Sequence, residues 1–271
     1  MSHGLFLNEK IKTVISEVVE VAQYLWEKGW AERNAGNISV NITDLLPERV
    51  NFFTDYDVYP LSVDLSSLAR NIFMLTATGV RMRDLAKSPE KGLCFIQIDS
   101  TGKGYRMSEF RSGFPNRQRL IPTSELPTHL AIQEMLKKAH PEMKVVVHAH
   151  VPEFIALSQI KEFKSATALN KLLFGMHPET KMFVPQGIGF VPYSLPGTES
   201  IAMATVKELE THPVVVWEKH GLLATGISVI EAYDTMDLLS KSAKIFLLCK
   251  SAGYDPEGLT NEQIGDIPQF S

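Results

Sequence analysis

Two valine-rich stretches decide the fold, KVVVHAH at residues 144–150 and PVVVWEKHG at residues 213–221. Consecutive β-branched residues favour extended backbone, so each run predicts a strand. The first strand ends on His148 and His150, and the second ends on His220. Because side chains alternate between the two faces of a strand, His148 and His150 point to the same face. Gly221 follows His220 and would let another backbone or a substrate approach closely.

The segments around these strands alternate between helical and extended patterns. Apolar spacing and cap residues predict helices over about 9–29, 123–140, 151–174, 198–211 and 228–252. Further strands are predicted at 38–40, 72–77 and 93–99, and residues 43–70 and 109–122 read as irregular. The alternation, with no low-complexity linker and no repeat, predicts one α/β domain over residues 1–271.

The composition excludes some classes of partner. The chain has 271 residues, 44% of them hydrophobic, and a formal net charge of −4. It lacks the basic field that nucleic acid or an anionic membrane surface would need. Cys94 and Cys249 lie far apart and are expected to be buried free thiols of a reducing compartment. With no signal-peptide pattern and no apolar run of about 18 residues, a cytoplasmic location is expected.

The strand-end histidines are candidate metal ligands. Two imidazoles on one strand face, joined by His220, would leave an open position for water or substrate, which is typical of catalytic zinc. Histidines that end strands and merely make hydrogen bonds are the alternative for all three. His129 is the nearest rival among the other histidines, because it shares a helix face with Glu125.

Three short segments have the chemistry of anion-binding turns: residues 34–37 (NAGN), residues 76–79 (TATG), and the pair Thr123-Ser124 at a helix start. Backbone N–H groups in such turns, with hydroxyl and amide donors, can cradle a phosphate. Taken singly, each is an ordinary turn or cap. Glu125 in the first helical turn is a candidate general base if it faces a metal site. Glu179 alone reads as a solvated charge.

Several motifs occur together in a characteristic order. They are ERNAGNISV (32–40), TATG (76–79), PTSELPTH (122–129), VVVHAH (145–150), GIGFVPYSLPGT (187–198) and VVVWEKHG (214–221). In this order and spacing the chain resembles the class II aldolase/adducin family over roughly residues 10–255. The resemblance implies an α/β/α sandwich around a mixed, largely antiparallel sheet. It also implies a cyclic homotetramer with its sites between subunits.

For the chemistry, the resemblance implies zinc-dependent retro-aldol cleavage of L-rhamnulose 1-phosphate to dihydroxyacetone phosphate and L-lactaldehyde. The implied zinc ligands, one ion per subunit, are His148, His150 and His220. Glu125 is the implied catalytic carboxylate, and Glu179 the implied carboxylate from the adjacent subunit. The implied phosphate and hydroxyl positions are Asn34, Gly36, Asn37, Thr78, Gly79, Thr123 and Ser124.

Two residues depart from the family pattern without removing a donor. Ala35 stands where the family tends to have glycine, and Thr78 stands where serine is usual. Three alternatives stay open. A fuculose-phosphate aldolase or a pentose-phosphate 4-epimerase of the same fold would use the same apparatus. A non-enzymatic adducin-like module need not keep the ligands. A metal-dependent hydrolase built on H-x-H would need a further late Asp or His ligand, and none stands at a strand end after His220.

Overall fold

The computed structural model describes residues 8–46, 57–109 and 120–268. Its helices are α1 (Glu9–Glu27), α2 (Met82–Leu85), α3 (Leu126–Ala139), α4 (Pro152–Leu157), α5 (Ala166–Met176), α6 (Pro178–Phe183), α7 (Glu199–Leu209), α8 (Val229–Ser251) and α9 (Asn261–Gly265). Its strands are β1 (Asn37–Asn41), β2 (Val58–Pro60), β3 (Ile72–Thr76), β4 (Leu93–Ile98), β5 (Gly104–Glu109), β6 (Val145–Ala149), β7 (Ile188–Val191), β8 (Val214–Trp217) and β9 (Gly221–Gly226).

These strands form one mixed sheet in the order β2-β5-β4-β3-β1-β6-β9-β8-β7. Neighbouring strands are antiparallel except β7 and β8, which run parallel. The expected mixed, largely antiparallel sheet is therefore confirmed. The expected single domain over residues 1–271 stays a prediction. It is supported by the pairing of β1, from the first part of the chain, with β6 at the centre of the sheet.

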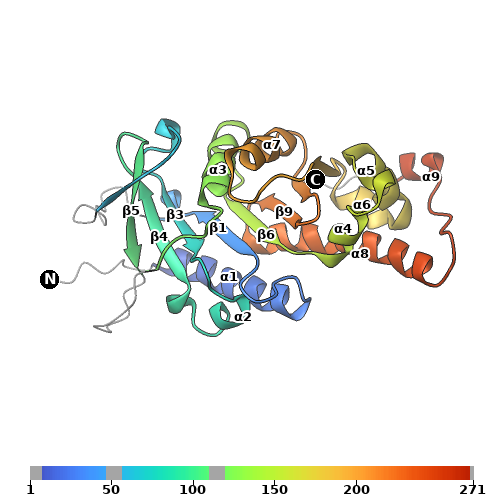
Figure 1. Cartoon of the computed structure of the whole chain (residues 1–271), viewed down its shortest axis with the longest axis horizontal. Coiled ribbons are helices and arrows are strands. Elements are labelled where there is room, and N and C mark those ends of the chain that lie inside the picture. Colours follow the sequence, from blue (N-terminus) through green and yellow to red (C-terminus); the bar gives the residue numbers. More distant parts are fainter. Residues whose placement is uncertain (1–7, 47–56, 110–119, 269–271) are drawn as a thin grey trace.

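Helices cover both faces of the sheet, and Figure 1 shows α3 and α7 on one side with α1 and α8 on the other. Alternation along β6 explains the layers. Val145 and Val147 pack into the core beneath α1 and α8, whereas Val146 packs with residues of α3 and α7. His148 lies two residues beyond Val146 and so shares the α3 face of the sheet. In the described residues, no helix is long and apolar enough to cross a membrane.

Several predicted elements differ from the structure. The single strand expected over 213–221 is two strands, β8 and β9, joined by a tight turn at residues 218–220. The turn forms because Lys219 adopts a left-handed φ of 63° and Gly221 a φ of 153°. His220 therefore lies in this turn and not at a strand end.

Three further strands were not predicted. The irregular region expected over 43–70 contains β2, β7 lies inside the motif GIGFVPYSLPGT (187–198), and β5 follows the turn after β4. Most of the irregular segment expected over 109–122 lies outside the described residues. Both cysteines are free, as predicted, but only Cys94 is fully buried and Cys249 is half-buried.

Candidate metal centre

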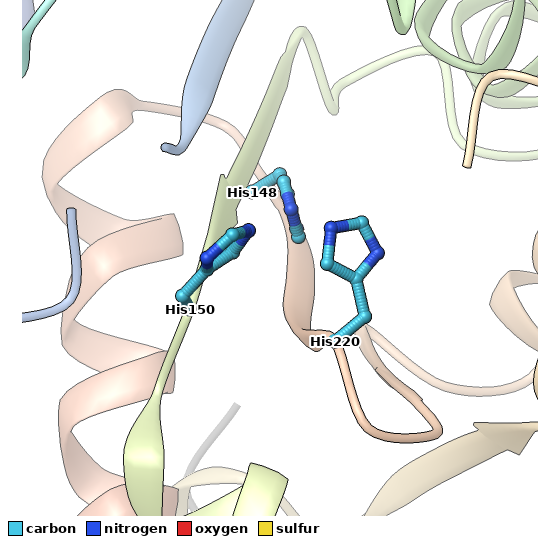
Figure 2. A group of neighbouring side chains, drawn as sticks. All are labelled: His148, His150 and His220. Atoms are coloured by element: carbon cyan, nitrogen blue, oxygen red, sulfur yellow. The ribbon is translucent and has the colours of Figure 1, made fainter. Parts of the chain in front are cut away.

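Three histidines, from β6, the residue after it and the β8–β9 turn, meet at one point. His148 is the second-last residue of β6 and is only 1% exposed, His150 follows β6, and His220 comes from the β8–β9 turn. Their ring centroids lie 4.7 to 5.3 Å apart, and one nitrogen of each lies within 4.8 Å of the others. Figure 2 shows the three rings gathered around a common point. The structure thus brings together the three ligands that the sequence predicted.

Hydrogen bonds decide which nitrogens face this point. His148 donates from Nδ1 to the carbonyl oxygen of Leu222 at 2.8 Å, which leaves Nε2 free. His150 uses Nδ1 for the carboxylate of Glu32 at 2.6 Å, which again leaves Nε2. Within the described part of the chain, the buried Nε2 of His148 has no hydrogen-bond partner. A buried imidazole nitrogen without a partner is the kind of atom that a metal ion satisfies.

Burial keeps two of these imidazoles neutral. Removal from water, together with the neighbouring His150, lowers the pKa of His148 to about 3. Removal from water also lowers the pKa of His220 to about 3, with His148 adding to the effect. Neutral imidazole is the form that binds a transition metal, so these two ligands need no deprotonation near neutral pH. The donor set of three imidazoles fits zinc.

Glu125 faces the histidines from the start of α3. Its carboxylate is buried, with Oε2 4.0 Å from Nε2 of His148 and Oε1 3.9 Å from Nε2 of His220. With metal–ligand bonds of about 2 Å, these separations leave room for an ion between the carboxylate and the rings. Glu125 is the residue that precedes the helix, and no side-chain capping bond is made there. Thr123 instead accepts a 3.3 Å hydrogen bond from the Glu125 N–H.

The histidines and Glu125 form one wall of a cavity of about 200 Å³. The rest of the lining comes from the three predicted turns: Asn34, Ala35, Gly36, Asn37, Ala77, Thr78, Gly79, Thr123 and Ser124. Strand pairing brings these turns together, because β1 lies between β3 and β6 and a bridge joins Ala77 to Pro122. Every predicted phosphate position thus lines the same cavity as the candidate metal ligands.

Close backbone packing around this cavity requires glycine at two points. Gly36 has a φ of 78°, and a Cβ there would lie 3.1 Å from the backbone oxygen of His148. Gly221 has a φ of 153°, and a Cβ there would lie 2.2 Å from the backbone oxygen of Ala149. The expected close approach at Gly221 is therefore confirmed, with the backbone of β6 as the neighbour.

Glu179 is the one predicted site residue that lies elsewhere in this chain. It belongs to α6 and does not line the cavity. Its Oε2 lies 2.9 Å from Nε2 of His177. Its implied role concerns an adjacent subunit and stays a prediction.

Three residues around the site were not singled out for the roles that their contacts suggest. Glu32 holds His150, although it stands in the ERNAGN stretch without any distinguishing spacing. Trp217 covers the rings, with its centroid 4.6 Å from that of His148 and 5.2 Å from that of His220. His129, the rival ligand, has both ring nitrogens engaged by Asn37 and Ser39 and so is not a ligand. The only feature of the sequence that pointed to His129 is its four-residue spacing from Glu125.

Comparisons with known proteins identify the family of this chain. The family described as "Class II Aldolase and Adducin N-terminal domain" matches residues 16–247. A protein of Bacteroides thetaiotaomicron named rhamnulose-1-phosphate aldolase is 38% identical over 93% of this chain and 92% of the relative. One of the same name from Pectobacterium atrosepticum is 32% identical over 92% of this chain and 90% of the relative. A sugar-phosphate aldolase structure from Thermotoga maritima superposes with a TM-score of 0.76 and 34% identity, over 92% of this chain and all of that one.

Proposed function

The chain belongs to the class II aldolase and adducin family, and we propose that it cleaves L-rhamnulose 1-phosphate to dihydroxyacetone phosphate and L-lactaldehyde. The observation that carries the proposal is the shared cavity. One wall holds three imidazoles and a buried carboxylate, and the others hold three turns suited to an anion. The names of the curated relatives supply the substrate, because the cavity alone does not distinguish one phosphorylated ketose from another.

We propose zinc as the ion, one per subunit, held by the Nε2 atoms of His148, His150 and His220. The unpartnered Nε2 of His148 and the low pKa values of His148 and His220 support this assignment. A bound zinc ion would supply Lewis acidity, which stabilises negative charge on the substrate oxygens while the carbon–carbon bond breaks. No lysine lines the cavity among the described residues, so a Schiff base has no candidate there.

The turns hold the phosphate end of the substrate in this proposal. Gly36 and Gly79 have positive φ angles, which turn the adjoining backbone and keep side chains out of the cavity. The side chains of Asn34, Thr78 and Ser124 add amide and hydroxyl donors. Because the net charge of the chain is −4, capture of an anion depends on these local donors.

Glu125 moves a proton at the dihydroxyacetone phosphate half. After the C3–C4 bond has broken, its carboxyl group gives a proton to C3, and in the synthetic direction its carboxylate takes that proton from C3 before the new bond forms. Its position within 4.0 Å of two ligand nitrogens places it beside the reacting carbons. The hydroxyl proton on the aldehyde half goes to Glu179 of an adjacent subunit in a homotetramer. This arrangement, and a cytoplasmic location, are part of the proposal.

The test is a comparison of two substrates. Lactaldehyde release from L-rhamnulose 1-phosphate and from L-fuculose 1-phosphate is followed through a coupled dehydrogenase, with metal content measured on the same samples. We expect a clear preference for the rhamnulose ester. Equal rates, or a preference for the fuculose ester, would reject the substrate assignment and favour the fuculose-type alternative. Epimerisation of a pentose phosphate without cleavage would favour the epimerase.

The variant Glu125→Gln separates binding from chemistry. It keeps the volume of the side chain and removes its capacity to carry a proton, so metal content should stay stoichiometric while kcat falls by about 100-fold or more. Near-normal kcat in a fully metallated variant would remove Glu125 from the mechanism. A wild-type protein that binds zinc but turns over neither substrate would favour the adducin-like alternative.

A further inference from the structure

A row of buried polar side chains runs from the cavity into the layer between α3 and the sheet. Glu125 and His129 come from the start of α3, and Asn37 and Ser39 come from β1. All four are less than 8% exposed, and His129 is completely buried. Asn37 and Ser39 lie on the α3 face because Ile38 and Val40 point into the opposite core. Buried polar groups on this scale are costly unless each finds a partner.

The hydrogen bonds of the row have one consistent direction. Asn37 donates from Nδ2 to Oε2 of Glu125 at 2.9 Å, so its Oδ1 is turned toward His129. An amide oxygen can only accept, and Nε2 of His129 must therefore carry the hydrogen that it shares with Oδ1. Nδ1 of His129 is then bare and accepts from the hydroxyl of Ser39 at 2.7 Å. A flipped Asn37 amide would set its oxygen against the carboxylate of Glu125, where two acceptors would face each other without a hydrogen.

The protonation state of His129 fits this direction. Burial lowers its pKa to about 4, so the ring is neutral under ordinary conditions. A neutral imidazole has one donor and one acceptor, and both are used here. His129 does not line the cavity, so its ring has no contact with the solvent there.

We propose that His129 is a positioning residue for the proton-transfer step: by donating to Asn37 it fixes the amide that in turn holds the Glu125 carboxylate toward the cavity. The inference rests on the proposed function, because it assigns a task to the carboxylate. The plain alternative is that the row only ties α3 to β1. The two hypotheses predict different results for a His129 variant. Loss of a contact between α3 and β1 lowers the stability of the protein, whereas loss of the orientation of the Glu125 carboxylate slows the proton transfer.

The experiment measures that proton transfer alone. Dihydroxyacetone phosphate is incubated in D2O with zinc-loaded protein and without aldehyde, and NMR follows deuterium entry at the carbon that bears the free hydroxyl. Glu125 takes the proton from this carbon and returns a deuteron from solvent. His129→Leu removes both ring nitrogens, whereas His129→Gln keeps an N–H donor near the position of Nε2. Misplacement of a reacting group by about 1 Å costs on the order of 100-fold in rate.

We expect His129→Leu to slow exchange and kcat by about 10- to 100-fold, with KM for the ketose and zinc content little changed. His129→Gln should recover most of that loss. Asn170→Leu serves as the stability control. Asn170 ties α5 to β7 through bonds of 3.0 and 2.8 Å to Ile188, and it takes no part in the site. This variant should unfold more easily and exchange at the wild-type rate.

The possible results distinguish failure of the positioning role from failure of the proposed function. Wild-type exchange in a folded, zinc-loaded His129→Leu variant would overturn the positioning role and leave the proposed function standing. Exchange could also slow in both His129 variants and in Asn170→Leu, in proportion to the loss of melting temperature in each. That result would show that the row only stabilises the packing of α3 on β1, and it would overturn the positioning role. Absence of exchange in the wild-type protein itself would reject the proposed function, and the inference with it.

Discussion

Substitution of Gly221 by alanine tests how the candidate metal centre is assembled. Gly221 follows His220 and precedes Leu222, whose carbonyl oxygen accepts the Nδ1–H of His148. A Cβ at this position would lie 2.2 Å from the backbone oxygen of Ala149 and 3.0 Å from Cα of His150. The new methyl group therefore meets the backbone of Ala149 and His150, and no flexible side chain can move away to admit it.

The size of the effect follows from these distances. An ordinary contact begins at about 3.4 Å, so β9 must retreat from β6 by roughly 1 Å. Metal ligands tolerate errors of about 0.2 Å, and the shift displaces both His220 and the carbonyl that orients His148. We expect zinc affinity to fall by at least about 100-fold, or roughly 3 kcal/mol. The metal-free protein should lose a further few kcal/mol of unfolding free energy through overpacking and backbone strain.

Two measurements and one control check this reasoning. Competition with a chromophoric chelator gives the zinc affinity, and denaturant unfolding of the metal-free protein gives the stability. Gly29→Ala is the control, because Gly29 also has a positive φ of 73° but nothing lies within 4 Å of its Cβ position. It should cost about 1–2 kcal/mol and leave zinc binding intact. Zinc affinity within threefold of wild type in Gly221→Ala would refute the argument.

Three further changes have defined outcomes. Glu32→Gln removes a charged acceptor from Nδ1 of His150 and should weaken zinc binding by about 10-fold in a chelator competition, whereas the exposed Glu27→Gln should not. His148→Ala should lose most of its zinc, and stoichiometric metal in the purified variant would show the ligand assignment wrong. Folding lowers the pKa of His129 from 6.5 to about 4, so protons favour the unfolded chain between these values. His129 should contribute a loss on the order of 3 kcal/mol as the pH of the metal-free protein falls from 6.5 to 4, in addition to the losses from His148 and His220. Denaturant titrations of His129→Gln should therefore show a loss smaller than that of the wild type.

The parts of the fold that the sequence predicted are those with a local periodic signal. α1 and α8 are long and have apolar residues at helical spacing, and β6 has three consecutive valines. The division of 213–221 into β8 and the start of β9 has no comparable signal. It depends on a left-handed Lys219 and on a glycine whose φ is set by contact with β6. The apolar run at 214–217 followed by charged residues is compatible with one long strand that ends in polar residues and with two strands joined by a polar turn.

In the site, too, the sequence predicted the features that depend on local spacing and missed those that depend on long-range packing. H-x-H on a strand fixes the relative direction of two imidazoles locally, and the anion-type turns are local as well. The role of Glu32 depends on the β1–β6 register, which sets Asn37 opposite His148 and brings the preceding loop beside His150. The role of His129 depends on where α3 lies over β1. Neither of these long-range placements can be read from spacing in a single sequence.

Strand order explains why the candidate metal ligands and the candidate anion-binding turns line one cavity. Because β1 is antiparallel to both its neighbours, its first residue, Asn37, lies at the edge of the sheet where β3 and β6 end. The turn before β1, the turn after β3 and the histidines at the end of β6 therefore meet at that edge, and the β8–β9 turn joins them because β9 is antiparallel to β6. α3 starts at the same edge and supplies Glu125. On the proposed function, a phosphate held by the turns would have its sugar directed toward the imidazoles, so the strand order would set the distance between the anchored and the reacting ends of the substrate.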